Sequence, residues 1–195
     1  AIRRQRQMCI RDRFAVANPE LWSPDTPVLY TAESKVYEGN TLKDEYTTRF
    51  GIRTLEIVPG KGFFLNGKLT KFKGVCNHHD LGPLGGAVND AAIRRQIRIL
   101  KDMGCNAIRT SHNMPAPELV EACDEMGMML MVESFDEWKS AKMANGYHKV
   151  FDEWVDKDLT NLIRHYRNNP SIVMWCTGNE VPDQWSGSNG PKLSR

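Results

Sequence analysis

No run of apolar residues in this 195-residue chain approaches the roughly 18 that a membrane-spanning helix needs. The N-terminus also has no apolar stretch typical of a signal peptide. We therefore expect no membrane partner. The compartment stays open between cytoplasm and periplasm, because the true start of the protein, and any secretion signal on it, can lie outside this sequence.

Cysteine is sparse and follows no metal-binding or disulfide pattern. The five cysteines are odd in number and include no C-x-x-C pair, and four of them lie in or beside apolar runs. A reduced thiol in such a place behaves as a small hydrophobic group. We interpret these residues as buried, unreactive thiols.

Strong charge of one sign is missing outside the first thirteen residues. Five arginines against one aspartate give residues 1–13 a charge of +4, so the other residues carry −2 of the total of +2. A slightly acidic body has no electrostatic footprint for nucleic acid, and the basic segment is short and aperiodic. We expect no nucleic-acid partner.

Several motifs of other chemistries are also absent. Ser111 has no G-x-S-x-G setting, which disfavours acyl transfer. His78 and His79 are adjacent and belong to no H-x-x-x-H pattern, which disfavours zinc. The glycine-rich segment 82–86 lacks the Lys-Ser/Thr of a phosphate-binding loop and indicates a turn.

Two kinds of secondary structure follow one another along the chain. Residues 14–58 hold short β-prone runs separated by proline and glycine, namely Val28–Thr31, Lys35–Tyr37 and Thr47–Phe50. These strands are too few to close a β-sandwich, so we expect the C-terminal part of one. Beyond them, four short non-alternating apolar runs are typical of parallel strands buried on both faces: Phe72–Cys76, Ala107–Ile108, Met128–Val132 and Ile172–Cys176.

Helical patterns fill the spaces between the apolar runs. One has the stripe Ile93, Ile97 and Leu100, with Asp90 as its expected N-cap and Gly104 as its end. A second lies between Pro117 and Gly127, and a third runs from Phe151 to Tyr166 before Asn168-Asn169-Pro170. The alternation predicts an α/β fold with a parallel sheet, the first half of a (β/α)8 TIM barrel.

Each predicted strand ends in polar residues, and a barrel builds its active site at that edge. The four clusters are Asn77–Asp80, Arg109–Asn113, Glu133–Glu137 and Gly178–Glu180. Together they suit a neutral polyhydroxylated ligand, which needs many directional hydrogen bonds.

We expect Trp175 and the methionines of 128–131 in the core. Trp138 and Trp185 either stack on a sugar ring or pack on a neighbouring loop.

A series of ordered motifs carries a resemblance to a known family. These are Leu21–Tyr30, Phe50–Arg53, Phe64–Lys68, Lys73–Asp80, Met103–His112, Cys123–Gly127 with Val132–Glu133, and Gly178–Glu180. Over roughly residues 18–185 the chain resembles the family 2 glycoside hydrolases, most closely the β-galactosidases. The resemblance implies the C-terminal part of an immunoglobulin-like β-sandwich at 14–58 and the N-terminal half of a TIM-barrel catalytic domain at 59–195. Residues 1–13 fit nothing in the family, and we interpret them as an unassigned basic leader, an artefact of sequence assembly.

The same resemblance assigns roles to site residues. It implies Glu180 as general acid/base, with Asn179 on the sugar 2-hydroxyl. His78 and His112 would line the glycone subsite, and Arg109 would position neighbouring carboxylates. The remaining substrate-site residues are the two acids Glu133 and Glu137. Some β-galactosidases bind magnesium through the second of these acids and a histidine two residues later, where this chain has Lys139, so we expect no metal and no cofactor.

The implied activity is that of a retaining exo-acting hydrolase of terminal β-D-galactosides, with a β-linked sugar as substrate. Its nucleophile would follow the seventh barrel strand, outside these residues, so we expect the 195-residue chain alone to be inactive. The alternatives are a β-glucuronidase, another family 2 glycosidase, or a non-catalytic carbohydrate-binding relative. The sequence does not predict an oligomeric state.

Overall fold

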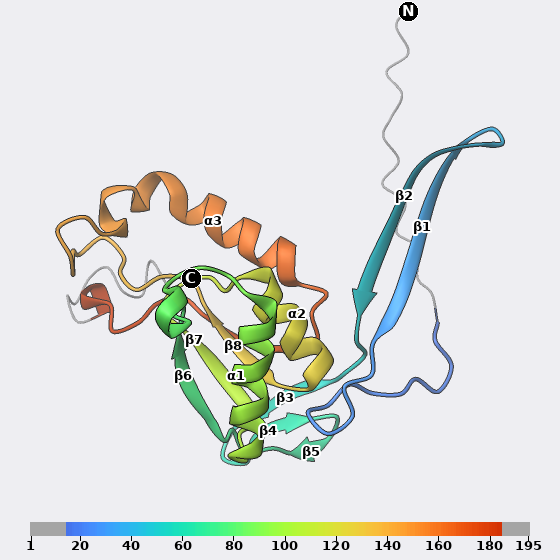
Figure 1. Cartoon of the computed structure of the whole chain (residues 1–195), viewed down its shortest axis with the longest axis horizontal. Coiled ribbons are helices and arrows are strands. Elements are labelled where there is room, and N and C mark those ends of the chain that lie inside the picture. Colours follow the sequence, from blue (N-terminus) through green and yellow to red (C-terminus); the bar gives the residue numbers. More distant parts are fainter. Residues whose placement is uncertain (1–14, 185–195) are drawn as a thin grey trace, which may run out of the picture.

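The computed structural model describes residues 15–184 in three separate sheets (Figure 1). The basic leader 1–13 and Trp185 lie outside the described residues. The largest sheet is parallel and has the order β6-β7-β8-β9. Its strands are Gly74–His78, Ala107–Ser111, Met129–Glu133 and Ile172–Cys176.

Three helices cover this sheet and alternate with its strands. They are α1 at Asp90–Asp102, α2 at Pro117–Met126 and α3 at Phe151–Tyr166. Short 3-10 turns lie at Gly82–Leu84, Tyr147–Lys149 and Pro182–Gln184. The predicted α/β class, with the strand and helix order of a TIM barrel, is confirmed.

The core lies between the sheet and the helices. Ile93, Ile97 and Leu100 of α1 pack with Ile108 of β7 and Leu130 of β8. The strands β7 and β8 are buried along most of their length, as predicted, but β6 alternates between exposed and half-buried residues and β9 is mostly half-buried. The expectation of burial on both faces was wrong for these two, because each has only one neighbour in the described sheet.

Some single-residue expectations about the core were also wrong. Trp175 on β9 is 41% exposed, although Met128 and Met129 are fully buried. Of the described cysteines only Cys123 is buried, whereas Cys76 is exposed. Both exposed residues lie on the outer strands of the sheet, where an apolar run does not guarantee a covering layer.

The helix ends follow the sequence signals with one correction. Asn89, not Asp90, caps α1, since its side-chain oxygen accepts from the amide of Ala92 at 3.0 Å. Asp90 instead pairs with Arg94 one turn later. The helix α2 begins at Pro117 and ends at Gly127 in the left-handed conformation, as predicted.

A long hairpin precedes the barrel and extends away from it (Figure 1). Its strands are β1, Tyr30–Glu38, and β2, Thr41–Phe50, which pair antiparallel. The predicted run Lys35–Tyr37 and the last two residues of Val28–Thr31 therefore lie in one strand, whereas Val28 and Leu29 precede it. The polar residues between them do not interrupt it, because the hairpin is exposed and its backbone pairing requires no apolar side chains. The assignment to an immunoglobulin-like sandwich stays a prediction.

A small antiparallel sheet between the hairpin and the barrel was not anticipated. It consists of β3, Leu55–Val58, β4, Gly62–Leu65, and β5, Lys68–Leu69. Phe63 and Leu65 pack with Ala107 and Met129, the first residues of β7 and β8. This sheet therefore covers the edge of the barrel opposite to the strand ends that carry the polar clusters.

The segment before the hairpin is attached to α2 through Trp22 and Pro24. Trp22 is fully buried and donates from its ring nitrogen to the carbonyl of Asp124 at 2.9 Å. Gly127, with φ of 71°, lies against Pro24 so closely that an added Cβ would be 2.3 Å from the Pro24 carbonyl oxygen.

The loop between β8 and α3 is folded around Glu137. This side chain is 4% exposed, and its oxygens accept from the amides of Lys142, Met143 and His148 at 2.6, 3.3 and 2.8 Å. The ring nitrogen Nδ1 of His148 adds a contact at 2.8 Å. Burial acts to raise the pKa of Glu137, but these donors outweigh it and lower the pKa to about 2.

Trp138 lies in the same loop and is buried. The indole is 3% exposed and donates to the carbonyl of Thr177 at 2.8 Å. It clusters with Phe135, Phe151 and Val181. Of the two alternatives left open for Trp138, packing on a neighbouring segment is the one observed.

We expect Gly127→Ala to destabilise the fold by about 3 kcal/mol or more, as the left-handed strain adds to a clash with the Pro24 backbone. Gly104→Ala is the matched control, because Gly104 also follows a helix with positive φ but nothing lies within 4 Å of its added Cβ. That variant should lose only about 1–2 kcal/mol. Urea unfolding measures both values, and equal losses would contradict the close approach.

Glu137→Gln should lower the free energy of unfolding by about 1–3 kcal/mol at neutral pH. Because folding lowers the pKa of Glu137 from 4.5 to about 2, its contribution is complete above about pH 5 and is lost as the pH falls toward 2. The variant should therefore lose less stability than the parent on acidification. Glu153→Gln, at an exposed carboxylate paired with Lys157, is the control and should behave as the parent.

Candidate active site

The polar clusters meet at one edge of the sheet because its strands are parallel and in register. Cys76 of β6 lies opposite Arg109 of β7, and Glu133 of β8 lies opposite Cys176 of β9. The residues that follow each strand therefore emerge at the carboxyl edge.

A buried carboxylate is at the centre of this edge. Glu133 is 0% exposed, and its two oxygens contact Arg109 Nε at 2.7 Å and His112 Nδ1 at 2.6 Å. Burying an ionised carboxylate is costly unless it is paired and hydrogen-bonded, and here it is both. The backbone amide of Glu133 also donates to Thr110 Oγ1 at 2.9 Å.

Arg109 links this carboxylate to the fourth strand. Its Nη2 donates to Asn179 Oδ1 at 3.0 Å, while Nη1 contacts the Cys76 sulfur at 3.6 Å. Burial acts to lower the pKa of Arg109, but hydrogen bonds to Cys76 and Glu133 outweigh it and raise the pKa. The guanidinium is therefore a permanent cation that ties β7, β8 and the end of β9 together.

Glu180 directly follows Asn179 and is exposed. Its φ is 43°, a left-handed conformation that few residues other than glycine adopt. The turn before it is tight, since an added Cβ on Gly178 would lie 2.8 Å from the Trp138 ring nitrogen and from Val181. Strained backbone of this kind concentrates at functional sites.

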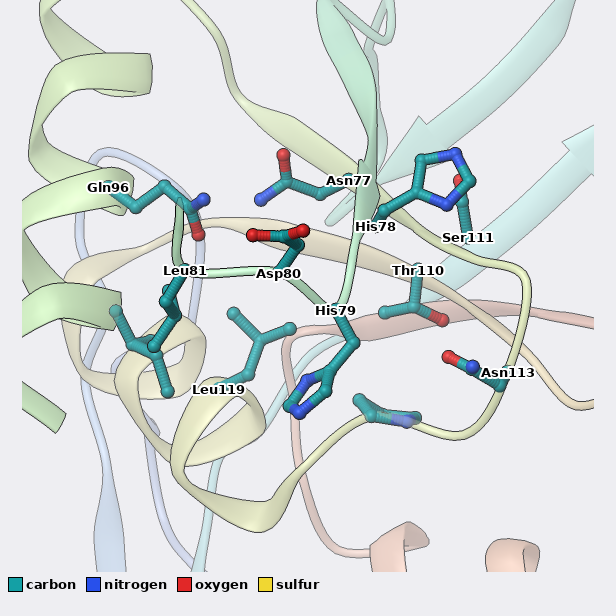
Figure 2. A pocket seen from close by; sticks show the side chains of 12 residues that line it. Asn77, His78, His79, Asp80, Leu81, Gln96, Thr110, Ser111, Asn113 and Leu119 are labelled. Atoms are coloured by element: carbon teal, nitrogen blue, oxygen red, sulfur yellow. The ribbon is translucent and has the colours of Figure 1, made fainter. Parts of the chain in front are cut away.

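Two histidines lie at the ends of the first two barrel strands, His78 on β6 and His112 directly after β7. His78 and His112 pack edge to face with ring centroids 5.0 Å apart. Because His112 uses Nδ1 on Glu133, its Nε2 is left for another partner. His79 points away from His78 and contacts the Gly86 carbonyl at 3.0 Å (Figure 2).

A cavity behind the strand ends is too small for a sugar. It has a volume of about 30 Å³, room for about one water molecule. Figure 2 shows that its lining comes from the ends of β6 and β7, from the segments that follow them, and from α1 and α2. This cavity therefore cannot hold a hexose.

The structure brings most of the predicted site residues together. Arg109, His112, Glu133 and Asn179 form one hydrogen-bonded network, with His78 packed against it and Glu180 next in the chain. Glu137 stands apart, buried in its own loop.

Sequence reasoning missed two residues of this edge, Asp136 and Lys142. Asp136 accepts from Asn179 Nδ2 at 3.0 Å, and Lys142 contacts both Asp136 and the Asn179 carbonyl. Asp136 could have been found, because it lies in the third polar cluster. Lys142 lies in a loop with no pattern that indicates its position.

The residues at the magnesium position of some β-galactosidases do not fit that ion here. Lys139 pairs with Asp152 at 2.5 Å, and the oxygens of Glu137 already accept from their own loop. Within residues 15–184, no three His, Cys, Asp or Glu side chains gather in a way that could hold a metal. No helix in that range is long and apolar enough to cross a membrane.

Comparison with solved structures agrees with this architecture. A β-glycosidase from Bacteroides vulgatus superposes with a TM-score of 0.85 at 46% identity, over 90% of this chain and 22% of that one. A β-glucuronidase from Parabacteroides merdae superposes with a TM-score of 0.72 at 30% identity, over 85% of this chain and 20% of that one.

Sequence comparison gives the same result. The β-galactosidase BoGH2A of Bacteroides ovatus is 50% identical over 189 residues, which cover 97% of this chain and 22% of the relative. The chain thus spans about a fifth of the length of these proteins.

Two family models match different parts of the chain. That of glycosyl hydrolases family 2 matches residues 2–53, a range that includes most of the basic leader. That of the glycosyl hydrolases family 2 TIM barrel domain matches residues 57–192. Since the barrel match covers more than half of the chain, the chain belongs to family 2 of the glycosyl hydrolases.

Proposed function

We propose that this chain is part of a retaining, exo-acting glycosidase that cleaves terminal β-D-galactosides, with Glu180 as its general acid/base. The observation that carries the proposal is the network that runs from buried Glu133 through Arg109 to Asn179, directly before Glu180. It holds an amide and an exposed carboxyl group side by side at the carboxyl edge of the sheet. In a retaining glycosidase one carboxyl group protonates the leaving oxygen, and a hydrogen bond to the 2-hydroxyl adds to the stabilisation of the transition state.

In the first step the Glu180 carboxyl group would donate its proton to the glycosidic oxygen as the bond from that oxygen to the anomeric carbon breaks. A second carboxylate would attack the anomeric carbon and form a glycosyl-enzyme. Glu180, now ionised, would then remove a proton from water as the water displaces that carboxylate. Asn179 would donate to the 2-hydroxyl, a contact that strengthens as positive charge develops on the sugar.

We do not assign the attacking carboxylate to any of the described acids near Glu180. Glu133 is held by Arg109 and His112, and Asp136 by Asn179 and Lys142. Glu137 is held by the backbone of its own loop. These acids serve to position other groups. Glu133 would thus act on the sugar through Arg109 and His112, while His78 and His112 would line the glycone subsite.

The charges at this edge favour a neutral sugar. Arg109 and Lys142 each contact a carboxylate of the protein, Glu133 and Asp136, so neither is free to pair with the carboxylate of a uronic acid. The 50% identity to a β-galactosidase supports the same choice. A β-glucuronidase is the second candidate, because structures of that activity share this fold at 30% identity.

Glu180→Ala in the full-length protein should slow a β-galactoside with a sugar or alkyl aglycone by about 10²–10⁴-fold, since such leaving groups need the proton. A dinitrophenyl β-galactoside should lose far less in the bond-breaking step, because its phenolate leaves unprotonated. Steady-state and burst kinetics on both substrates measure the difference. Equal losses would remove Glu180 from the acid role, and Glu153→Ala on the exposed face of α3 is the control.

Comparison of 4-nitrophenyl β-D-galactoside with the β-D-glucuronide tests the glycone. The full-length protein should prefer the galactoside in kcat/KM by about 100-fold or more, because Arg109 and Lys142 already pair with protein carboxylates and would leave the uronate carboxylate unpaired. Preference for the glucuronide would favour the second candidate. Hydrolysis of no β-glycoside in a broad panel would favour a non-catalytic relative.

A further inference from the structure

The amide of Asn179 is fixed in one orientation by partners that cannot exchange roles. Its Oδ1 accepts from the Arg109 guanidinium, which only donates. Its Nδ2 donates to Asp136 Oδ1 at 3.0 Å, and a carboxylate only accepts. A flipped amide would face a donor with a donor and an acceptor with an acceptor. One Nδ2 hydrogen is left without a partner among residues 15–184 and is free to donate.

Lys142 holds both Asp136 and the backbone before Glu180. Its Nζ lies 3.0 Å from Asp136 Oδ1 and 2.5 Å from the Asn179 carbonyl oxygen. The side chain of Lys142 is 22% exposed, against 50% for Asp136. The ammonium therefore neutralises the carboxylate that accepts from Asn179, and it fixes the peptide that joins Asn179 to Glu180.

Lys142 is itself placed by the buried acid of its loop. The backbone amide of Lys142 donates to Glu137 Oε2 at 2.6 Å. The loop is attached to the segment after β9 through the Trp138 indole and the Thr177 carbonyl, and Figure 1 shows the two segments next to each other. Glu137 thus reaches the active site indirectly, through Lys142.

Asp136 is set up to remain ionised. Burial acts to raise its pKa, but the hydrogen bonds from Asn179 and Lys142 outweigh it and lower the pKa. A protonated Asp136 would carry an O–H donor, and a flipped Asn179 amide could then accept from it through its oxygen. A carboxylate held ionised keeps the amide in its orientation as the pH falls.

We infer that Asp136 and Lys142 are a positioning pair that holds the Asn179 amide with its remaining N–H available to the sugar 2-hydroxyl. The inference rests on the proposed function and adds two residues to it. Neither has to touch the substrate. Their effect is to orient Asn179 before the substrate binds, so that no reorganisation is needed as the transition state forms.

Asp136→Asn and Lys142→Met in the full-length protein test the pair with two aryl β-galactosides, one with and one without the 2-hydroxyl. Both variants should lower kcat for the 2-hydroxy substrate by about 10–100-fold with little change in KM. On the 2-deoxy substrate they should lose less than about 3-fold, because Asn179 then has no partner to orient for. Lys139→Met is the control. Lys139 lies on the same loop as Lys142 but pairs with the exposed Asp152 of α3, so this variant should match the parent on both substrates.

A double-mutant cycle with Asn179→Ala completes the test. In that background Asp136→Asn should cost little further, because the amide it positions is gone. Equal losses on the two substrates, or additive losses in the cycle, would overturn the inference while leaving Glu180 and the galactosidase activity in place. If the parent does not distinguish the two substrates, the proposed role of Asn179 fails instead. Lys142→Met keeps the test valid if Asp136→Asn does not fold.

Discussion

The site depends on one buried charge, the carboxylate of Glu133. A fully buried carboxylate is tolerated only if donors surround it, and the donors here are Arg109 from β7 and His112 just beyond it. The hydrogen bonds to Glu133 therefore fix the side chains of Arg109 and His112 at the carboxyl edge of the sheet. Arg109 carries the constraint onward to Asn179, so the position of the residue before Glu180 follows from a requirement on the neighbouring strand β8.

A second buried acid organises the other side of the edge by different means. Glu137 is four residues beyond Glu133, yet its oxygens accept mainly from backbone amides of its own loop. Glu133 holds side chains of the sheet, and Glu137 holds the main chain that delivers Lys142. Asn179 is the point at which the two arrangements meet, since Arg109 reaches it from one side and Asp136 with Lys142 from the other.

The amino edge of the sheet, where the strands begin, contacts the segments that precede the barrel. The small sheet β3-β4-β5 and Trp22 cover the first residues of β7 and β8 with apolar contacts. Arg53 donates to the carbonyls of Pro170 and Ile172 and so ties the segment after the hairpin to the start of β9. A TIM barrel carries its functional polar groups at the carboxyl edge, while the opposite edge serves stability, and the two edges of this sheet differ in the same way.

The sequence by itself determined the order of strands and helices in the barrel part, the helix ends at Pro117 and Gly127, and the clustering of polar residues at the carboxyl end of each barrel strand. These features depend on local chemistry: side-chain periodicity, the backbone freedom of glycine and the missing amide of proline. Parallel strands must bring their carboxyl ends to one edge, so the sequence also placed Arg109, His112, Glu133 and Asn179 in one region, and the resemblance to family 2 singled them out there. Only the tertiary structure decided which acid is an organiser, that Asp136 and Lys142 join the site, and that Trp175 is exposed. Those outcomes depend on which donor or covering layer reaches a side chain across the fold, and contacts between residues 24 to 70 positions apart in the chain leave no local pattern in the sequence.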